Sequence, residues 1–379
     1  MIKLLVTDGD GTLFAPSEAD YLGDFRVWLR QEGIALGVAS NGQRGVILRR
    51  FADHGISPPD YIVTRADVGN KKKPSPAFVD KLMEQAGVEP RETAYIGDDE
   101  RTDNYLAINS RVMPLLARYS EGYSGKYAFP ISSLYGLKRF LEVFGRQPAP
   151  YFGWVCKSDN YDFRAVISQH SRIGSQMRAV LKEHRDVQVG PGMSLRPLLF
   201  YYTLSQCYLS GAHDGKRLIA VYPGSQPKRP NSTLAEFGEL FDLTSQSNYL
   251  TDLLIREKPA PEQKKAGVRR SFGPQLETVR LNDAHKRRIS GKSVLVLDDY
   301  TTSGVSLAVA HALLKQAGAS KVIGVAIGKF RNKQRVVKLP ASYDPFRVMS
   351  AGTRLEEDVL DGVQHAEADQ HFYDRVISA

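Results

Sequence analysis

The sequence predicts an α/β protein made of two doubly wound parallel-sheet domains, each with a site at the carboxyl edge of its sheet. Three observations support this prediction. Short apolar runs of strand length alternate with helical segments, and several of these runs end directly in acidic, hydroxyl or glycine residues. The length of 379 residues suits two domains better than one. A segment dense in proline and glycine, residues 145–150, resembles a linker, so we expect domains at residues 1–146 and 147–379.

The composition predicts a soluble globular protein, because 42% of the residues are hydrophobic and 25% are charged. No apolar run reaches the roughly 18 residues of a transmembrane helix, so we expect no membrane partner. A chemical motif begins almost at the first residue, which leaves no room for a signal peptide. Cys156 and Cys207 are too few for a disulfide framework. These features predict a cytoplasmic protein, and they are compatible with a homodimer.

The net charge of +9 is unevenly distributed along the chain. Residues 1–146 carry 19 Lys and Arg against 19 Asp and Glu, whereas residues 147–379 carry 32 against 23. The excess of positive charge therefore belongs to the second half. It suggests a polyanionic partner, either a nucleic acid or a small polyphosphate, and composition alone does not choose between them.

The first candidate site follows the buried strand predicted for residues 2–7. Asp8 and Asp10 come directly after this strand, each followed by a glycine that lets the loop backbone approach a phosphate group. One carboxylate can act as nucleophile and the other as general acid or base, provided that a cation suppresses their mutual repulsion. A simple turn built from two Asp-Gly pairs is the competing interpretation.

Two further segments supply groups that can hold a phosphate. The strand predicted for residues 34–39 ends at Ser40, whose hydroxyl suits a phosphate oxygen. Lys73 precedes the helix predicted for residues 77–86, which places a cation near a helix N-terminus, a natural site for an anion.

A second acidic cluster follows the strand predicted for residues 94–96. It contains Asp98 and Asp103, whose carboxylates can complete a shell of oxygen ligands around Mg²⁺. The sequence thus presents four polar segments in order, and three of them directly follow a predicted strand.

These four segments, in this order, resemble the motifs of the haloacid dehalogenase superfamily. The resemblance implies a Rossmann-like core and a Mg²⁺-dependent phosphohydrolase. In it, Asp8 would be the nucleophile that becomes an aspartyl-phosphate, and Asp10 the general acid and base. Ser40 and Lys73 would hold and neutralise the phosphoryl group. The implied metal ligands are Asp8, Asp10, Asp98 and Asp103.

The spacing of these motifs predicts that the first domain has no cap. Only 27 residues separate Thr12 from Ser40, and 32 separate Ser40 from Lys73. Neither interval can hold a cap domain in addition to the helices of the core. Capless members of the superfamily act on bulky substrates or are covered by a neighbouring domain or subunit, so we expect an open site that the second domain covers.

The second candidate site lies at residues 293–307. A predicted apolar strand leads into Asp298 and Asp299, then into a turn rich in hydroxyl groups and glycine, and then into a helix predicted for residues 307–317. The backbone amides, hydroxyls and helix N-terminus of such a turn suit a phosphate monoester. The two acids are placed to reach the vicinal hydroxyls of a sugar that carries this phosphate.

This order resembles the phosphoribosyl-pyrophosphate (PRPP) motif of type I phosphoribosyltransferases and implies a fold like theirs. By this resemblance Asp298 and Asp299 would bind the ribose hydroxyls. Tyr300 departs from the family pattern, in which a small aliphatic residue is common, and would alter access near the ribose. The residues implied to bind the 5-phosphate are Thr301, Thr302, Ser303, Gly304 and Ser306.

Two more segments are candidates for binding pyrophosphate. A strand predicted for residues 217–222 leads into a loop that carries Gly224, Ser225 and Lys228. Residues 256–292 contain 11 Lys and Arg against 4 Asp and Glu, in an order similar to the flexible basic loop of ComF-like phosphoribosyltransferases. The competing interpretations are an ordinary solvated turn and a nucleic-acid surface, and the scarcity of aromatic residues makes the second the less favoured. The candidate loop residues are Lys264, Lys265, Arg269 and Arg270.

The two sites together predict a bifunctional enzyme. The first domain would be a phosphatase, and the second would transfer phosphoribose from PRPP to an acceptor that the sequence does not identify. The expected ligand is PRPP or a nucleotide-like phosphorylated small molecule. The alternative is a phosphatase regulated by a second domain that senses PRPP or a nucleotide. Fused proteins of this kind resemble those in bacterial stress-response and phage-defence gene clusters.

Overall fold

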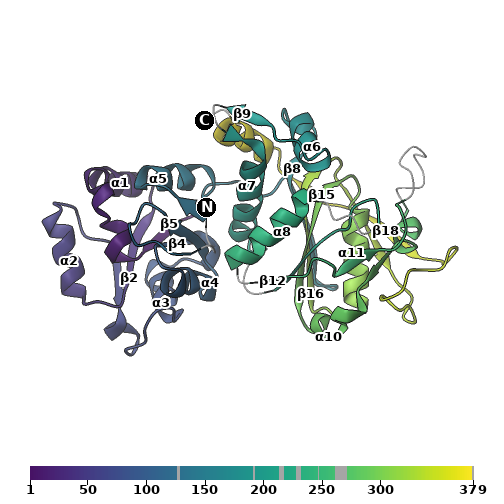
Figure 1. Ribbon diagram of the computed structural model, residues 1–379, viewed down its shortest axis with the longest axis horizontal. Helices are drawn as coiled ribbons and strands as arrows, with labels where there is room; N and C mark the ends of the chain where they lie inside the picture. Colours follow the sequence, from purple (N-terminus) through teal and green to yellow (C-terminus); the bar gives the residue numbers. More distant parts are fainter. Residues whose placement is uncertain are drawn as a thin grey trace. The chain divides into compact units, whose positions relative to one another are not determined.

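The computed structural model describes residues 1–125, 129–190, 193–212, 217–227, 232–245, 247–260 and 271–377. The chain forms two compact units, whose main division falls between Gln147 and Pro148 (Figure 1). The first unit is Met1–Gln147 with the segments Leu204–Gly215 and Leu243–Gln246. The second unit is Pro148–Thr203, Lys216–Asp242 and Ser247–Ala379.

A six-stranded, wholly parallel sheet forms the centre of the first unit, with the strand order β3-β2-β1-β4-β5-β6. This is the order of a doubly wound α/β fold, which confirms the predicted α/β class and parallel sheet for this half of the chain. The strands are β1 (Leu4–Thr7), β2 (Ala35–Ser40), β3 (Tyr61–Thr64), β4 (Thr93–Gly97), β5 (Met113–Ala117) and β6 (Phe129–Ile131).

Helices cover both faces of this sheet, with α1 and α5 on one face and α3 and α4 on the other (Figure 1). The helices are α1 (Ala19–Gln31), α2 (Arg44–Asp53), α3 (Ala77–Ala86), α4 (Tyr105–Asn109) and α5 (Leu134–Val143). Short helical turns are η1 (Gly9–Leu13), η2 (Pro16–Glu18), η3 (Arg65–Val68), η4 (Pro90–Glu92) and η5 (Glu100–Asn104).

Burial on both faces explains why the strands of the first sheet are almost continuously apolar. All residues of β1, β4 and β5 are buried, as expected for parallel strands enclosed between two layers of helices. The helix predicted for residues 77–86 is α3, and its apolar side packs on this sheet through Phe78, Val79 and Leu82.

The first unit contains no domain inserted between its motifs. Between Thr12 and Lys73 the chain forms only the core elements α1, β2, α2 and β3 with short turns. The predicted absence of a cap is therefore confirmed for this stretch of the chain.

The second unit is built on a seven-stranded sheet with the order β12-β11-β15-β16-β8-β7-β19. Five strands run parallel, but β7 and β19 run antiparallel to their neighbours. The prediction of a wholly parallel second sheet is therefore wrong at this edge. The physical reason is the four-residue turn between β7 and β8, which is too short for the crossover that parallel strands need. These strands are β7 (Phe152–Cys156), β8 (Tyr161–Ser168), β11 (Leu218–Val221), β12 (Asn248–Tyr249), β15 (Ser293–Thr301), β16 (Lys321–Lys329) and β19 (Val363–Gln364).

The described residues of this unit also form three two-stranded sheets: β9 (Gln188–Gly190) with β10 (Met193–Ser194), β13 (Leu254–Arg256) with β14 (Val279–Leu281), and β17 (Lys333–Lys338) with β18 (Glu356–Asp361). Helix α11 (Val305–Gln316) packs against β15, β16 and β17. The other helices after Pro148 are α6 (Gly174–Lys182), α7 (Leu195–Leu209), α8 (Ser232–Ser245), α9 (Gly273–Leu276), α10 (Lys286–Ile289) and α12 (Glu367–His371), with the turns η7 (Asp283–His285) and η8 (Phe372–Ile377).

Among the described residues, no helix combines the length and apolar character required to cross a bilayer.

One ion pair fixes the loop between α2 and β3 to the sheet of the first unit. Arg26, buried in α1, donates hydrogen bonds to the carbonyl oxygen of Pro58 at 3.0 Å and to Asp60 Oδ1 at 2.9 Å. The other oxygen of Asp60 accepts a 2.7 Å hydrogen bond from the backbone of Leu36. Burial alone would raise the pKa of Asp60, but the hydrogen bonds from Arg26 and Leu36 outweigh it and lower the pKa.

Replacing Asp60 with Ala should destabilise the first unit by about 2 kcal/mol, because the buried guanidinium of Arg26 then loses a hydrogen-bond acceptor. The pKa of Asp60 is lower in the folded state than in the unfolded state. Asp60 therefore contributes to the free energy of unfolding above its unfolded pKa, and this contribution is lost as the pH falls through its folded pKa. The gap between parent and Asp60→Ala should therefore shrink below about pH 4. Urea unfolding followed by tryptophan fluorescence in a Trp154→Phe background, which leaves Trp28 as the reporter, measures the difference in the free energy of unfolding. The exposed Asp53→Ala is the matched control, and a gap independent of pH would contradict the assignment.

Candidate functional site

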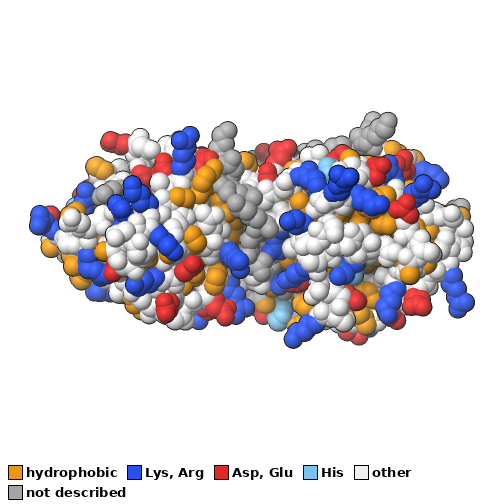
Figure 2. Space-filling view, turned by 90° about the horizontal axis from the view of Figure 1, so that it is seen from below, with side chains coloured by type: hydrophobic (Ala, Val, Ile, Leu, Met, Phe, Trp, Pro, Cys, Tyr) orange, Lys and Arg blue, Asp and Glu red, His pale blue; other side chains and the backbone are white. Residues whose placement is uncertain are grey.

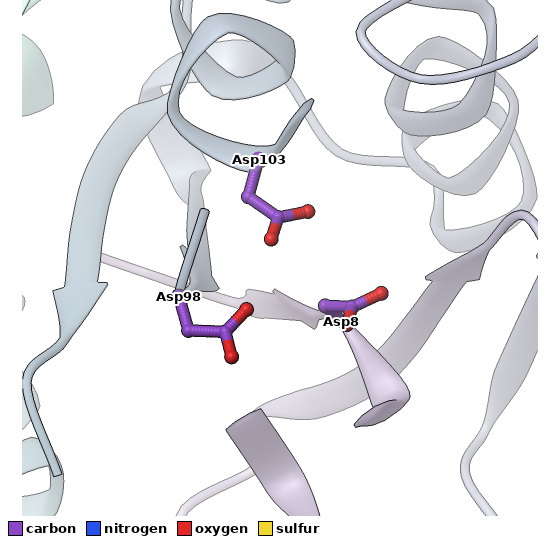
Figure 3. A group of neighbouring side chains, drawn as sticks. All are labelled: Asp8, Asp98 and Asp103. Atoms are coloured by element: carbon purple, nitrogen blue, oxygen red, sulfur yellow. The ribbon is translucent and has the colours of Figure 1, made fainter. Parts of the chain in front are cut away.

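Three carboxylates from separate segments meet at the carboxyl edge of the first sheet. Asp8 follows β1, Asp98 follows β4, and Asp103 lies in the turn η5. Figure 3 shows their side chains pointing toward one another, and one oxygen of each lies within 4.8 Å of the others. They converge because β1 and β4 are adjacent parallel strands with the pair Thr7 and Ile96 in register.

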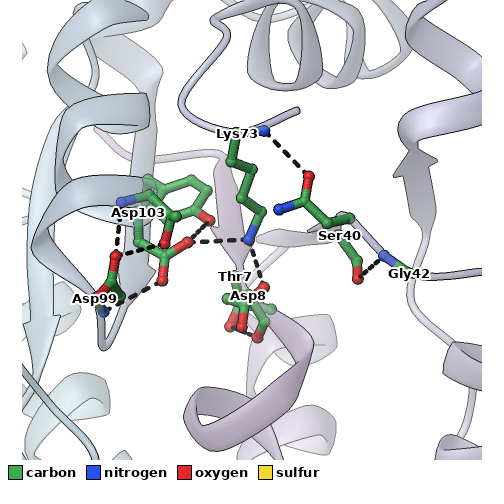
Figure 4. A network of polar contacts seen from close by, with 10 residues as sticks. Thr7, Asp8, Ser40, Gly42, Lys73, Asp99 and Asp103 are labelled. Atoms are coloured by element: carbon green, nitrogen blue, oxygen red, sulfur yellow. Dashed lines mark hydrogen bonds and ion pairs between the residues drawn. The ribbon is translucent and has the colours of Figure 1, made fainter. Parts of the chain in front are cut away.

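The ammonium group of Lys73 joins two of these carboxylates (Figure 4). Its Nζ donates a 2.9 Å hydrogen bond to Asp103 Oδ1 and also pairs with Asp8 Oδ1. The Lys73 side chain is only 3% exposed. Its backbone N–H donates a 3.1 Å hydrogen bond to Asn41 Oδ1, which fixes the loop that delivers it. The cation predicted near α3 therefore lies at the sheet edge between two carboxylates.

Tyr95 is a member of this site that sequence reasoning missed. It is buried in β4, and its hydroxyl donates a 2.7 Å hydrogen bond to Asp103 Oδ1. The other oxygen of Asp103 accepts a 3.3 Å hydrogen bond from the backbone of Asp99. Both oxygens of Asp103 thus have protein partners, and the orientation of this carboxylate is fixed. An alternating aromatic residue in a buried strand gives no sequence signal for such a role.

Burial and mutual repulsion perturb the acids of the cluster. Burial is the largest cause that raises the pKa of Asp8 to about 6; the Lys73 cation opposes it, and the charge of Asp103 adds to it. Burial also raises the pKa of Asp98, against a 2.7 Å hydrogen bond from the Ser120 hydroxyl. For Lys73, burial alone would lower the pKa, but the carboxylates of Asp103 and Asp8 raise it. An added cation would relieve the repulsion between these acids.

Two glycines make the close approach of these segments feasible. Gly11 has a φ of +73°, and a Cβ there would lie 2.3 Å from Asp98 Oδ2. A Cβ on Gly97 would lie 2.2 Å from the Cβ of Asp103. Any side chain at either position would therefore displace a carboxylate of the cluster.

The structure describes the side chain of Ser40 but not that of Asp10, the other two residues predicted for this site. Ser40 ends β2, is 8% exposed, and its Oγ accepts a 3.0 Å hydrogen bond from the backbone of Gly42, which leaves its hydroxyl proton free to point elsewhere. Asp10 lies in the turn η1, and its side chain falls outside the described part of the chain.

The second candidate site lies where β15 meets α11. The strand continues through both acids to Thr301, further than the sequence predicted, because it pairs with β16 up to Lys329. Asp298 and Asp299 are both buried. Asp299 pairs with Lys182, the last residue of α6, which sequence reasoning did not identify.

Asp298 is buried among polar groups that perturb its carboxyl group. Its Oδ1 accepts a 2.9 Å hydrogen bond from the backbone of Asp299, whereas its buried Oδ2 has no hydrogen-bond partner among the described residues. Burial, then the adjacent charge of Asp299, raises its pKa to about 8, while Lys182 and the hydroxyl of Ser306 oppose this rise. A buried carboxylate oxygen without such a partner can accept a hydrogen bond from a ligand.

Hydrogen bonding and close packing fix the turn at residues 301–304, which follows Asp298 and Asp299. Thr301 Oγ1 accepts a 2.8 Å hydrogen bond from the backbone of Gly304, which has a φ of +75° and immediately precedes α11. A Cβ on Gly304 would lie 2.0 Å from Gln334 Oε1, so this position also excludes a side chain. Thr302 and Ser303 are half-buried at the surface of the turn.

The loop predicted to bind pyrophosphate leaves the same edge of this sheet. β11 lies beside β15, and the Tyr222 backbone donates a 2.8 Å hydrogen bond to the carbonyl of Leu297. The buried Arg256 donates to the Gly224 carbonyl at 2.5 Å, and the Ser225 carbonyl accepts a hydrogen bond from the backbone of Ala260 at 2.7 Å. The predicted residues Lys228, Lys264, Lys265, Arg269 and Arg270 lie outside the described residues.

Residues 27–114 match the model of a family described as haloacid dehalogenase-like hydrolase. This part of the first unit is therefore similar to a haloacid dehalogenase-like hydrolase domain. The matched stretch includes Ser40, Lys73, Asp98 and Asp103, and it begins after the loop that carries Asp8.

Several solved structures are similar to the chain. An uncharacterized protein from Listeria monocytogenes serotype 4b is 16% identical, with coverage of 37% of this chain and 97% of that one and a TM-score of 0.32. A HAD phosphatase from Thermococcus onnurineus is 29% identical, with coverage of 31% of this chain and 55% of that one and a TM-score of 0.28. The cobalt-bound deoxy-D-mannose-octulosonate 8-phosphate phosphatase from Haemophilus influenzae is 21% identical, with coverage of 37% of this chain and 88% of that one and a TM-score of 0.27. No curated protein matches the sequence.

In metal-free protein, the Asp8 carboxyl group should titrate with a midpoint near 6, as its burial requires. Lys73→Met should raise this midpoint further, because burial remains while the opposing cation is lost. The chemical shift of ¹³C-labelled aspartate carboxyl groups measures it, with the Asp8 resonance assigned by its loss in Asp8→Asn. A midpoint near that of a free aspartate would contradict the geometry of the cluster.

Proposed function

We propose that the first unit is a Mg²⁺-dependent phosphohydrolase that acts through a phosphorylated Asp8. The observation that carries this proposal is the convergence of Asp8, Asp98 and Asp103 at one sheet edge, with the Lys73 ammonium group between two of them. A nucleophile, a fixed cation and acidic metal ligands are the parts that phosphoryl transfer through a covalent intermediate requires.

The acids of the cluster fit a hard divalent cation. Their donors are all carboxylate oxygens, the ligands that Mg²⁺ prefers. Both oxygens of Asp103 already have protein partners, so Asp8 and Asp98 are the acids best placed to hold the metal, with Asp10 joining from the same loop. The raised pKa values of Asp8 and Asp98 favour a cation that would stabilise their ionised forms. Bound Mg²⁺ would neutralise charge on the phosphoryl oxygens.

The residues of the site then have separate tasks. A carboxylate oxygen of Asp8 attacks phosphorus, and the bond to the leaving-group oxygen breaks. Asp10 donates the proton that the leaving group needs and later removes a proton from the water that hydrolyses the aspartyl-phosphate. Lys73 and the Ser40 hydroxyl bind phosphoryl oxygens, and Tyr95 with Asp103 keeps Lys73 in place.

Asp8→Asn should abolish Mg²⁺-dependent hydrolysis of a generic phosphate monoester, with a loss of roughly a thousandfold or more, because the nucleophile is removed at unchanged volume. Phosphate release from p-nitrophenyl phosphate, with and without EDTA, measures it. Asp53→Asn on the exposed side of α2 is the control and should keep parent activity. Parent turnover in Asp8→Asn would overturn the assignment.

For the second unit we propose that it binds PRPP and transfers phosphoribose to an acceptor. The supporting observation is the buried and unpartnered Oδ2 of Asp298, beside Asp299 and immediately before a hydroxyl-rich turn at a helix N-terminus. Ribose hydroxyls would supply the missing donors, and the turn would hold the 5-phosphate. A pyrophosphate group would then meet the loop at Gly224 and Ser225.

A small polyphosphate suits the basic second half better than a nucleic acid does. On the face seen in Figure 2, described Lys and Arg side chains lie among acidic and uncharged ones. Nucleic-acid binding surfaces collect such charge along a groove and interleave it with aromatic rings. We infer that PRPP or a related nucleotide-like phosphate is the ligand.

PRPP with Mg²⁺ should raise the melting temperature of the protein, since a ligand that binds only the folded state stabilises it by about 2.7 kcal/mol at a hundred times its Kd. The double variant Asp298→Asn, Asp299→Asn should lose most of this shift. The control is Glu356→Gln, Asp358→Asn, which changes two exposed acids of β18.

Differential scanning fluorimetry with and without PRPP measures this shift. An equal shift in the first double variant, or none in the parent, would remove the support for PRPP binding. Pyrophosphate release in the presence of candidate bases separates a transferase from a domain that only senses PRPP.

A further inference from the structure

Lys329, the last residue of β16, is a buried cation that neither proposed activity has used. It is 0% exposed. Its Nζ donates to the carbonyl oxygen of Lys333 at 2.9 Å and to the carbonyl oxygen of Thr302 at 3.2 Å. The ammonium group also lies over the ring of Phe152, 4.4 Å from its centroid, and over that of Phe163 at 5.3 Å.

Burial of such a group is costly, and here it is compensated by carbonyl dipoles and ring faces. Burial lowers the pKa of Lys329 to about 7. An uncharged side chain of the same length would fill this space without that cost. The contact that distinguishes the lysine is the one to Thr302, because Thr302 belongs to the turn proposed to hold the 5-phosphate.

The carbonyl groups of this turn are all directed toward the protein. The Thr302 carbonyl accepts from Lys329, and the Ser303 carbonyl accepts a 2.8 Å hydrogen bond from the backbone of Arg335. The Gly304 carbonyl accepts from the backbone of Ala308 at 2.9 Å. The C=O and N–H groups of a trans peptide point in opposite directions, so the contact of the Thr302 carbonyl with Lys329 turns the N–H of Ser303 away from the protein interior. The N–H of Gly304, in contrast, donates to Thr301 Oγ1.

The peptide between Thr302 and Ser303 depends on a side chain for this orientation. The carbonyls of Ser303 and Gly304 are held by backbone donors, which no substitution removes. The Thr302 carbonyl is held by the Lys329 ammonium group. Without it, this peptide could rotate and present its carbonyl oxygen to the ligand, where it would repel a phosphate.

We propose that Lys329 is a positioning residue that fixes the Thr302–Ser303 peptide so that the N–H of Ser303 faces the 5-phosphate of the ligand. This inference rests on the proposed binding of a phosphoribosyl ligand by the second unit. Lys329 acts from behind the turn and does not touch the ligand, because its side chain is fully buried and its Nζ already donates to two carbonyl oxygens.

The test compares two ligands that use different parts of the site. In Lys329→Met, the affinity for ribose 5-phosphate should fall about tenfold, the loss expected when one phosphate contact is reversed. The affinity for pyrophosphate, which meets the loop at Gly224 and Ser225, should stay within about twofold of the parent. Isothermal titration calorimetry of the full chain measures both. Lys338→Met, a change at an exposed position of β17, is the control and should alter neither affinity.

Each other outcome overturns the inference in an identifiable way. Unchanged affinity for ribose 5-phosphate in Lys329→Met shows that the turn does not need this lysine. An equal loss for both ligands shows that Lys329 supports only the fold. If the parent binds neither ribose 5-phosphate nor PRPP, the proposed function fails and this role fails with it. If Lys329→Met does not fold, Lys329→Gln, which retains an N–H donor, should show a smaller loss for ribose 5-phosphate alone.

Discussion

A single ammonium group makes the first site compatible with folding. Asp8, Asp98 and Asp103 would repel one another at the edge of a buried sheet, and Lys73 is the protein cation that lies between two of them. The position of Lys73 depends in turn on the loop that precedes α3. The Tyr95 hydroxyl fixes the carboxylate of Asp103, which accepts the hydrogen bond from Lys73. The chemistry we propose for this unit therefore depends on one buried network of polar contacts, in which Asp8 would lose its cation without Lys73, and Tyr95 would lose its acceptor without Asp103.

The sequence predicted much of this site because parallel strands deliver their carboxyl ends to one edge. Asp8 and Asp98 directly follow a strand, and Ser40 ends one, and each of these strands could be recognised by its apolar residues, so their convergence followed from the fold class. Lys73 was predicted from its position shortly before the helix α3. Tyr95 could not be found in this way, because an aromatic residue within a buried strand has the same pattern whether or not its hydroxyl has a polar partner.

The second unit was predictable in outline and less so in detail. The strand, acid pair, turn and helix occur in the predicted order, but the sheet is mixed, since a short turn reverses β7 and a two-residue strand, β19, pairs with it. Such a short strand has no readable periodicity. Lys182 and Lys329 were missed because Asp299 and Thr302, which they contact at the second site, lie 117 and 27 residues away along the chain. A charged residue near the end of a helix or strand is also usually solvated.

The short outer strands of both sheets bear on how two copies of this chain could associate. The first sheet ends in strands of four and three residues, β3 and β6, and the second in two strands of two residues, β12 and β19. A neighbouring molecule that added a strand to any of these edges would gain very few main-chain hydrogen bonds. If the protein forms a homodimer, contacts between side chains, and not the continuation of a sheet across the interface, would have to hold it together.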